Sequence, residues 1–278
     1  MLGKDRDSPS KLMSNKASNI KMIILFFSII ILFYSLNTYL RNVVWEEGTA
    51  LWSDCVLKSP YKARPHNNLG LAYGKQDMLD EAIYECKKAV AINPNLARGH
   101  YNLGLAYDKK GLLDEAILEF KQAISINPNL TEAYNNLGNI YDKKGMVEEG
   151  ILEYKKIITI DSDDAVAHYN LGLAYWEKGM VDKAIYEYEK ALNINPEYIM
   201  AHVNLGAAFS NKGMFDKAIS EFKKAISIDP KFSKAHYNLG VAYYYKENYK
   251  LAIVHCDKAV ELGGSVNPKL LELLKPYR

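Results

Sequence analysis

The chain of 278 residues carries almost no net charge. It has 35 lysines and arginines against 33 aspartates and glutamates, which gives a formal charge of +2 at pH 7. Proteins that bind nucleic acid through its phosphates present an excess of basic charge, whereas here the lysines are mostly matched by nearby acidic residues. The small net charge therefore argues against nucleic acid as a partner.

The motifs of familiar enzyme and metal sites are also missing. There is no glycine-rich phosphate loop, no G-x-S-x-G nucleophile elbow and no H-E-x-x-H zinc motif. Acidic pairs such as Asp80 and Glu81 recur at predicted helix starts and do not converge on one place. We therefore expect no enzyme activity and no catalytic, cofactor-binding or metal-binding residues.

One segment lacks charge altogether. Residues 22–40, MIILFFSIIILFYSLNTYL, contain no charged side chain over 19 positions, about the length of a bilayer-spanning helix. No pair of small residues resembling a signal-peptidase site follows them. The sequence therefore predicts an uncleaved signal anchor, a transmembrane helix over residues 21–40, after a basic tail over residues 1–20. Basic residues are denser before the span than after it, which predicts a cytoplasmic N-terminus and an extracytoplasmic remainder, periplasmic in a bacterium.

What the sequence has in abundance is repetition. The motif HNNLGLAY at residues 66–73 returns as HYNLGLAY, YNNLGNIY, HYNLGLAY, HVNLGAAF and HYNLGVAY, each time after 34 residues. A constant period without insertions indicates similar structural elements stacked on one another. The six predicted repeats span residues 63–96, 97–130, 131–164, 165–198, 199–232 and 233–266.

Each repeat is predicted to fold as two helices, because apolar and small residues recur at spacings of three and four. Small residues are expected where the two helices approach most closely, and aromatic residues fill the space beside them. Proline then ends the second helix. In the second repeat these positions are Leu103, Gly104, Tyr107, Ala116, Phe120, Ala123 and Pro128.

This pattern resembles the tetratricopeptide repeat, and the resemblance covers residues 63–266. It implies an all-α fold, a right-handed superhelix (α-solenoid) of six helix pairs. The third repeat departs from the pattern with Gly150, Ile157 and Ser162, so it is predicted to be the softest layer. The leucine-rich segment 267–278 is predicted to form a capping helix over the last repeat.

Residues 41–62 match the second helix of a further repeat only in part, with Trp52 at the aromatic position and Pro60 at the closing one. They are predicted to form a lead-in helix between membrane and array. This junction resembles the one in membrane O-mannosyltransferase-like proteins that carry C-terminal tetratricopeptide repeats. The resemblance leaves an alternative function open, that of an accessory or detached substrate-recruiting module of a membrane glycosyltransferase.

The histidines and cysteines recur with the repeats. The histidines at the fourth position of five repeats are too far apart to share a metal ion, so they are interpreted as packing residues. Cys86 and Cys256 replace the buried aromatic residue of their repeats and are too distant to bridge. Cys55 and Cys86 are interpreted as core thiols, with a disulfide as the alternative. The histidines are His66, His100, His168, His202 and His236.

The resemblance implies a ligand groove along the first helices, lined in this family by the second, fifth, sixth, ninth, twelfth and thirteenth residues of each repeat. The sixth residue is always asparagine, whose amide can both donate to and accept from the backbone of an extended peptide. Such a row is similar to that of the O-linked N-acetylglucosamine transferase, although asparagine is also common here for other reasons. The row is Asn68, Asn102, Asn136, Asn170, Asn204 and Asn238.

Aromatic and basic residues are unevenly spread along this predicted groove. We therefore predict a membrane-anchored scaffold that binds an extended peptide or partner protein, with the acidic end of the partner toward the membrane. The fifth position lacks the lysine that the family's clamp for chaperone tails requires, so chaperone C-termini are not expected as ligands. The aromatic C-terminal half has Tyr169, Trp176, Tyr237, Tyr244 and Tyr245; the basic half has Arg64, Lys75, Arg98, Lys109 and Lys143, with Tyr101 its one aromatic residue.

Overall fold

The computed structural model describes residues 30, 32 and 48–278. The predicted basic tail, residues 41–47 and nearly all of the predicted membrane span lie outside the described residues. Within the described part, no helix is both long and apolar enough to cross a membrane. The chain divides into two compact parts, Met1–Pro94 and Asn95–Arg278, each with its own helices.

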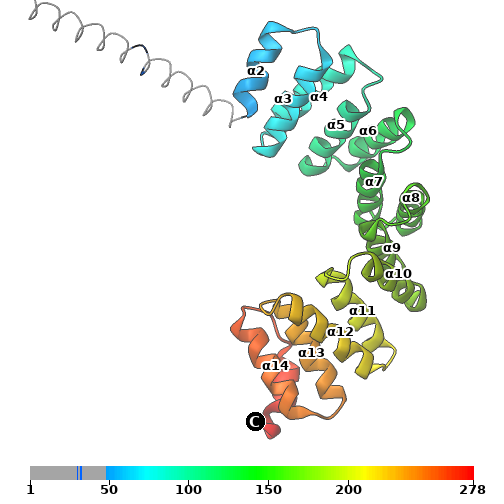
Figure 1. Ribbon diagram of the computed structural model, residues 1–278, viewed down its shortest axis with the longest axis vertical. Helices are drawn as coiled ribbons and strands as arrows, with labels where there is room; N and C mark the ends of the chain where they lie inside the picture. Colours follow the sequence, from blue (N-terminus) through cyan, green and yellow to red (C-terminus); the bar gives the residue numbers. More distant parts are fainter. Residues whose placement is uncertain (1–29, 31, 33–47) are drawn as a thin grey trace, which may run out of the picture. The chain divides into compact units, whose positions relative to one another are not determined.

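Residues 48–94 of the N-terminal part form three helices, and α3 and α4 make up the first predicted helix pair. The lead-in helix α2 packs on α3. All three are visible in Figure 1: α2 (Gly48–Lys58), α3 (Ala63–Lys75) and α4 (Leu79–Ile92).

The buried thiol of Cys86 holds the pair α3–α4 together. A Cβ added to Gly70 would lie 2.5 Å from the Cys86 Sγ, so the sulfur occupies the space that glycine leaves. Burial raises the pKa of Cys86 to about 12. Cys55 and Cys86 are both free thiols. Cys86 is buried, as predicted for a core thiol, whereas Cys55 is only half-buried on α2, which has no buried residue.

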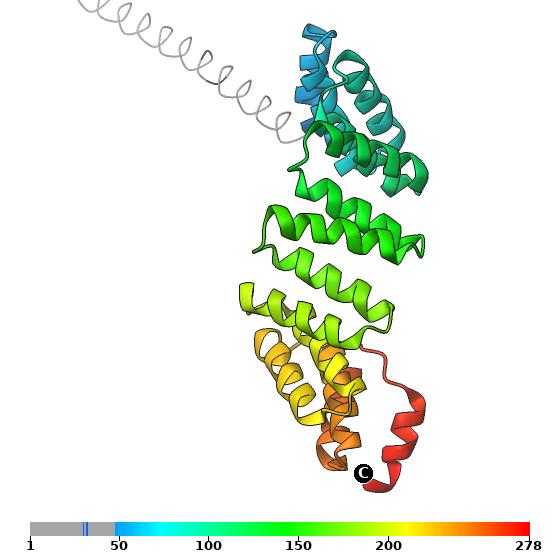
Figure 2. The same ribbon diagram turned by 90° about the vertical axis from the view of Figure 1, so that its right-hand side faces the viewer.

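The C-terminal part consists of five further helix pairs and a short terminal helix (Figures 1 and 2). Every pair falls within one predicted repeat, and residues 95–278 contain no strand. The helices are α5 (Ala97–Lys110), α6 (Leu113–Ile126), α7 (Thr131–Lys143), α8 (Val147–Ile160), α9 (Ala165–Glu177), α10 (Val181–Ile194), α11 (Ile199–Asn211), α12 (Phe215–Ile228), α13 (Ser233–Tyr245), α14 (Tyr249–Glu261), α15 (Pro268–Leu274) and η1 (Lys275–Tyr277).

Glycine and an aromatic ring set the spacing of four of these five pairs, as predicted, and in α13–α14 the sulfur of Cys256 takes the place of the ring against Gly240. Phe222 of α12 is 1% exposed, and a Cβ on Gly206 of α11 would lie 2.5 Å from its ring. Any larger residue at Gly206 would push the two helices apart. The same contact joins Gly104 to Phe120 and Gly172 to Tyr188.

The turn inside each pair needs a left-handed backbone. Gly111 has a φ of 82° there, and the third to fifth repeats also use glycine. In the sixth repeat this position is Glu247, with a φ of 58°. A residue with a side chain is strained in this region. The turn between α13 and α14 is therefore less favourable than the turns that use glycine.

Neighbouring pairs are joined by lysines that reach the first turn of the preceding second helix. Lys246 lies 3.0 Å from Asp216, and Lys144, Lys178 and Lys212 make the equivalent contacts with Asp114, Glu148 and Asp182. The acidic partners are at least 70% exposed, so each ion pair contributes little by itself.

The terminal helix α15 covers the last pair. Leu274 is fully buried and Leu270 is 8% exposed, and both join the core that contains Cys256 of α14. Beyond the helix, the Tyr277 ring stacks on Tyr249 with centroids 3.8 Å apart. The segment thus extends the core beyond the sixth repeat.

In the third repeat, Gly150 stands where the other repeats have alanine, and a carboxyl group occupies the space of the alanine methyl group. Gly150 of α8 lies against the Asp142 carboxyl, since a Cβ there would be 2.5 Å from Oδ1. The Tyr154 hydroxyl lies 2.7 Å from Oδ2 of Asp142 and 2.8 Å from Oδ1 of Asn139. Asp142 Oδ1 is buried and has no hydrogen-bond partner among the described residues.

Candidate functional site

A pocket of about 450 Å³ lies on the faces of α9, α11 and α13. Four of the predicted groove residues meet in it, together with an apolar floor and a lysine. The lining residues are Tyr169, Leu173, Trp176, Tyr188, Met200, Asn204, Ala207, Lys234 and Asn238.

The aromatic residues of this pocket differ in exposure. Tyr169 is 8% exposed and Tyr188 1%, and the Tyr169 ring packs on Tyr198 with centroids 4.7 Å apart. Burial raises the pKa of both pocket tyrosines. They form rigid walls, whereas Trp176 is only half-buried and offers its indole to a ligand.

The asparagine row is used first to join successive repeats. The amide of Asn136 donates to the Tyr101 hydroxyl at 3.1 Å, and that of Asn204 to the Tyr169 hydroxyl at 3.0 Å. Asn170 donates to the Oδ1 of Asn135 at 2.7 Å. These amides therefore keep only part of their hydrogen-bonding capacity for a ligand.

Asn238 is different because Val203 stands where its partner would be. Val203 is fully buried and its side chain cannot accept a hydrogen bond. Within residues 95–278 the Asn238 amide makes no hydrogen bond. It lines the pocket with its side chain unpaired.

The other amides of the row are half-buried on their helices. Asn68 accepts a hydrogen bond from Asn67 at 3.2 Å. With Trp52, Leu71 and Lys75 it lines a separate pocket of about 530 Å³ in the N-terminal part. Asn102 lies on α5.

The predicted basic half of the groove is largely neutralised in α5 and α7. Arg98 lies 3.0 Å from Glu132 and Lys143 lies 2.7 Å from Asp108, while Lys109 is exposed on α5 and Arg64 on α3. The aromatic pocket contains the exposed Lys234, which has no acidic partner among the described residues.

Four predicted aromatic residues do not line the pocket. Tyr245 stacks on Phe215 with centroids 5.1 Å apart, and Tyr244 packs beside Tyr249 at 5.8 Å. Tyr237 packs against the core, and Tyr101 lies on Phe120 at 5.8 Å. Their main contacts are with their own chain.

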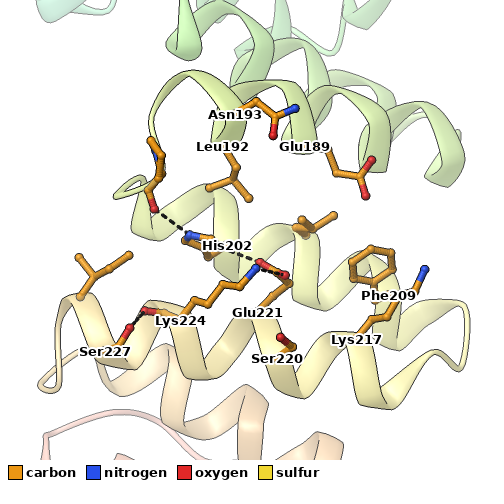
Figure 3. Close-up of a pocket in the computed structure, with 13 residues that line it drawn as sticks. Glu189, Leu192, Asn193, His202, Phe209, Lys217, Ser220, Glu221, Lys224 and Ser227 are labelled. Carbon is orange, nitrogen blue, oxygen red and sulfur yellow. Dashed lines mark hydrogen bonds and ion pairs between the residues drawn. The ribbon is translucent and has the colours of Figure 1, made fainter.

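A second cleft, of about 730 Å³, lies between α10 and α12 (Figure 3). Part of its polar lining is bonded internally: Lys224 lies 2.8 Å from Glu221, and Ser227 donates to the Lys224 carbonyl at 2.7 Å. None of the predicted groove residues lines this cleft, whereas four of them line the pocket that contains Trp176.

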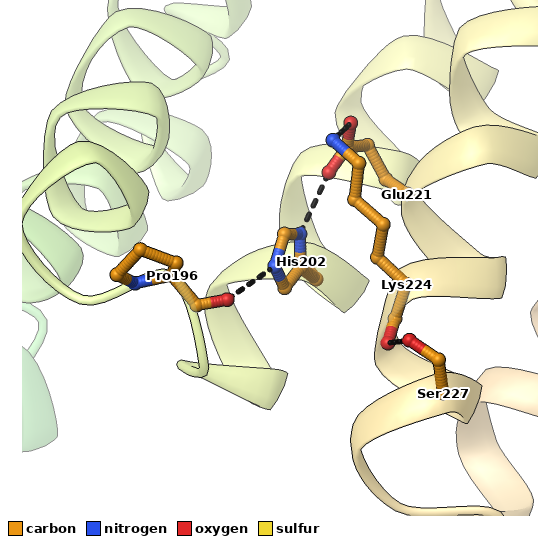
Figure 4. A network of polar contacts seen from close by, with 5 residues as sticks. All are labelled: Pro196, His202, Glu221, Lys224 and Ser227. Atoms are coloured by element: carbon orange, nitrogen blue, oxygen red, sulfur yellow. Dashed lines mark hydrogen bonds and ion pairs between the residues drawn. The ribbon is translucent and has the colours of Figure 1, made fainter.

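At the base of this cleft His202 makes two hydrogen bonds (Figure 4). Its Nδ1 lies 2.7 Å from Glu221 Oε2, and its Nε2 lies 3.0 Å from the carbonyl oxygen of Pro196. Burial raises the pKa of Glu221, but the hydrogen bonds from His202 and Lys224 outweigh this and the pKa is lowered.

The same histidine–glutamate contact recurs in four repeats, with Nδ1 to Oε2 distances of 2.5 to 2.7 Å. The interpretation of these histidines as packing residues was therefore incomplete, because they are also hydrogen-bond partners of a carboxylate, three of them buried and His100 half-buried. A sequence signal existed: each of these histidines is followed by glutamate 19 residues later. The pairs are His66–Glu85, His100–Glu119, His168–Glu187 and His202–Glu221.

The comparison with known families identifies the repeats. A family model described as TPR repeat matches half of the chain, over residues 78–111, 109–145, 138–179 and 211–247. A second, described as Tetratricopeptide repeat, matches residues 165–198 and 233–263. The chain belongs to the tetratricopeptide repeat family.

Solved structures of tetratricopeptide repeat form agree with this assignment. MamA is 32% identical with a TM-score of 0.55, over 58% of this chain and 94% of its own. YrrB, described as a TPR protein with an unusual peptide-binding site, is 21% identical with a TM-score of 0.55, over 66% and 95%. PilF of Pseudomonas aeruginosa is 16% identical with a TM-score of 0.66, over 78% and 97%.

The likeness to YrrB and PilF shows the fold alone. No curated protein matches the chain. The tetratricopeptide repeat assignment supports a role in binding other proteins, and the choice of site within the repeats rests on the pocket geometry.

Proposed function

We propose that this chain is a non-catalytic scaffold that holds an extended segment of a partner protein in the pocket of α9, α11 and α13. The observation that carries this is the coincidence in one pocket of a half-buried indole with an amide and a lysine that have no partner among the described residues, those of Trp176, Asn238 and Lys234. These groups suit an apolar side chain, a peptide backbone and a carboxylate.

The energies require an extended partner. Burying one apolar side chain beside Trp176 contributes about 1.5 to 3 kcal/mol, and a hydrogen bond to Asn238 contributes roughly 0.5 to 1.5 kcal/mol. Association costs about 4 to 15 kcal/mol. Further contacts along the first helices must therefore add to those in the pocket.

The ion pairs change where an acidic group of the partner is expected. Arg98 and Lys143 already have carboxylate partners, whereas Lys234 has none among the described residues. We therefore place the acidic group of the partner beside its apolar residue, at the fourth to sixth repeats, and not toward the membrane.

The same proposal includes the membrane anchor over residues 21–40. Its support is the uncharged run of 19 residues and the basic residues before it. The repeats would then lie outside the cytoplasm. The glycosyltransferase-linked role stays an alternative, because the pocket does not distinguish a recruited substrate from any other partner.

A random peptide library selected on the full-length chain in detergent tests the site. Selected peptides should carry a large apolar residue next to Asp or Glu. Trp176→Ala should weaken their binding at least about tenfold, equivalent to about 1.4 kcal/mol, and Lys234→Glu should select against the acidic residue.

Tyr186→Ala serves as the matched control, because Tyr186 is an aromatic residue of α10 that is 55% exposed outside the pocket. It should leave affinity unchanged. Peptides that bind equally well to the Trp176 and Lys234 variants would place the site elsewhere.

A further inference from the structure

The sixth repeat replaces the glutamate of the recurring contact with a second histidine. His236 of α13 faces His255 of α14, with their Nδ1 atoms 3.1 Å apart. The Nε2 of His236 lies 3.1 Å from the carbonyl oxygen of Pro230, as in the other repeats. This contact joins two bases where the others join a base and an acid.

The hydrogen-bond partners determine how many protons this pair can hold. The Pro230 carbonyl can only accept, so Nε2 of His236 carries a proton. The Nδ1 of neutral His236 then accepts the Nδ1–H of His255. One further proton, on Nε2 of His255, would leave this bond in place. A second would have to sit on Nδ1 of His236, point two N–H groups at each other across 3.1 Å and break the bond.

The surroundings of His255 oppose a second positive charge. The Tyr243 ring of α13 stacks on it with centroids 5.8 Å apart, and Lys223 of α12 lies over the same tyrosine ring, with its Nζ 5.8 Å from the centroid. Burial, then the charges of His236 and Lys223, lower the pKa of His255.

The acidic side chains of α14 bond to other cations. Asp257 lies 3.1 Å from the Arg278 guanidinium Nη1, and Glu261 lies 2.8 Å from Lys258 Nζ. Neither Asp257 nor Glu261 therefore takes the place of the glutamate that bonds to the histidine in the other repeats.

The helix that carries His236 also carries two pocket residues. Lys234 and Asn238 lie two residues before and two residues after it on α13. Displacement of α13 from α14 would therefore move one wall of the pocket.

We propose that the His236–His255 contact makes the sixth repeat an acid-sensitive latch, which separates α13 from α14 when both histidines are protonated and weakens partner binding. The effect on binding rests on the proposed function, and the separation of the helices does not. The sign follows from linkage: a histidine held neutral by the fold contributes stability above its ordinary pKa, which is lost as pH falls below that value.

Amide hydrogen exchange on the full-length chain without partner tests the latch. From about pH 7.5 to about pH 5.5 the opening constant of α13–α14 amides, corrected for intrinsic exchange, should rise about tenfold. The amides of α11–α12 should not show this rise. His255→Glu restores the glutamate of the other repeats and should abolish the rise.

The reverse exchange is the matched control. Glu221→His creates a histidine pair in the fifth repeat and should add an acid-induced opening of α11–α12 to that of α13–α14. The proposal is contradicted if the opening constant of α13–α14 still rises at low pH in His255→Glu, or if it does not rise in the wild-type chain.

Binding is measured separately with a peptide selected at neutral pH. The wild-type affinity should fall about tenfold more than that of His255→Glu between the same two pH values. Absence of any pocket-binding peptide contradicts the proposed function, while exchange still decides whether the latch opens.

Discussion

Asparagine at the sixth position of a repeat has a role that depends on one residue in the preceding repeat. Where that residue is Tyr101 or Tyr169, its hydroxyl takes a hydrogen bond from the asparagine amide. Where it is Val203, the Asn238 amide has no hydrogen bond among the residues that the structure describes. The same amide is therefore structural in one repeat and available to a ligand in another.

Asp142 is a comparable case in which one residue changes the pH dependence of a repeat. Burial raises the pKa of its carboxyl, the Tyr154 hydrogen bond opposes this, and the charge of Glu177 adds to it. An acid with a raised pKa in the fold destabilises that fold once ionised, so this cost appears as pH rises through the raised value.

Asp142→Asn should therefore raise stability at neutral pH by about 1 kcal/mol and remove this pH dependence. Urea unfolding at neutral and acid pH measures both effects. Asp108→Asn is the control at the same position of the second repeat. Because Asp108 pairs with Lys143 at 2.7 Å, its loss should give no gain. The assignment would be contradicted if the free energy of unfolding of Asp142→Asn decreased with rising pH as much as that of the wild-type chain.

At the scale of the element, each helix pair within residues 95–278 is closed by side chains from its own two helices and from neighbouring helices of this part. Against the pair α13–α14, the terminal helix α15 supplies such side chains with Leu270 and Leu274. A short helix of seven residues is not stable alone, so its buried leucines must hold it.

Leu274→Ala should cost about 2 to 5 kcal/mol because its side chain is fully buried. The loss should appear as a lower urea midpoint and faster exchange of α14 amides. Leu273→Ala is the neighbouring control, 45% exposed, and should change stability by about 0.5 kcal/mol or less. Equal effects of the two substitutions would mean that α15 does not cap the core.

At the scale of the whole molecule, the chain combines a tetratricopeptide repeat array with a proposed anchor. The uncharged segment 22–40 and the basic residues before it predict that the repeats lie outside the cytoplasm. This orientation decides which partners the pocket meets, and which pH the histidine latch experiences.

A reporter that is active only outside the cytoplasm, fused after Arg278, should be active in cells. Deleting residues 22–40 from the same fusion should silence it, because the uncharged run is the proposed export signal. Activity without that run, or silence with it, would reverse the orientation.

The sequence by itself determined the helix pairs, because the 34-residue period and the small and aromatic positions act within one repeat. Gly206 and Phe222 illustrate this: their types predict a close approach that the structure contains. Only the tertiary structure decided which polar groups remain free for a ligand. Neutralisation of Lys143 by Asp108 and the unpaired state of Asn238 depend on which side chains meet across neighbouring repeats. The residue pattern within one repeat does not predict these contacts between side chains of neighbouring repeats.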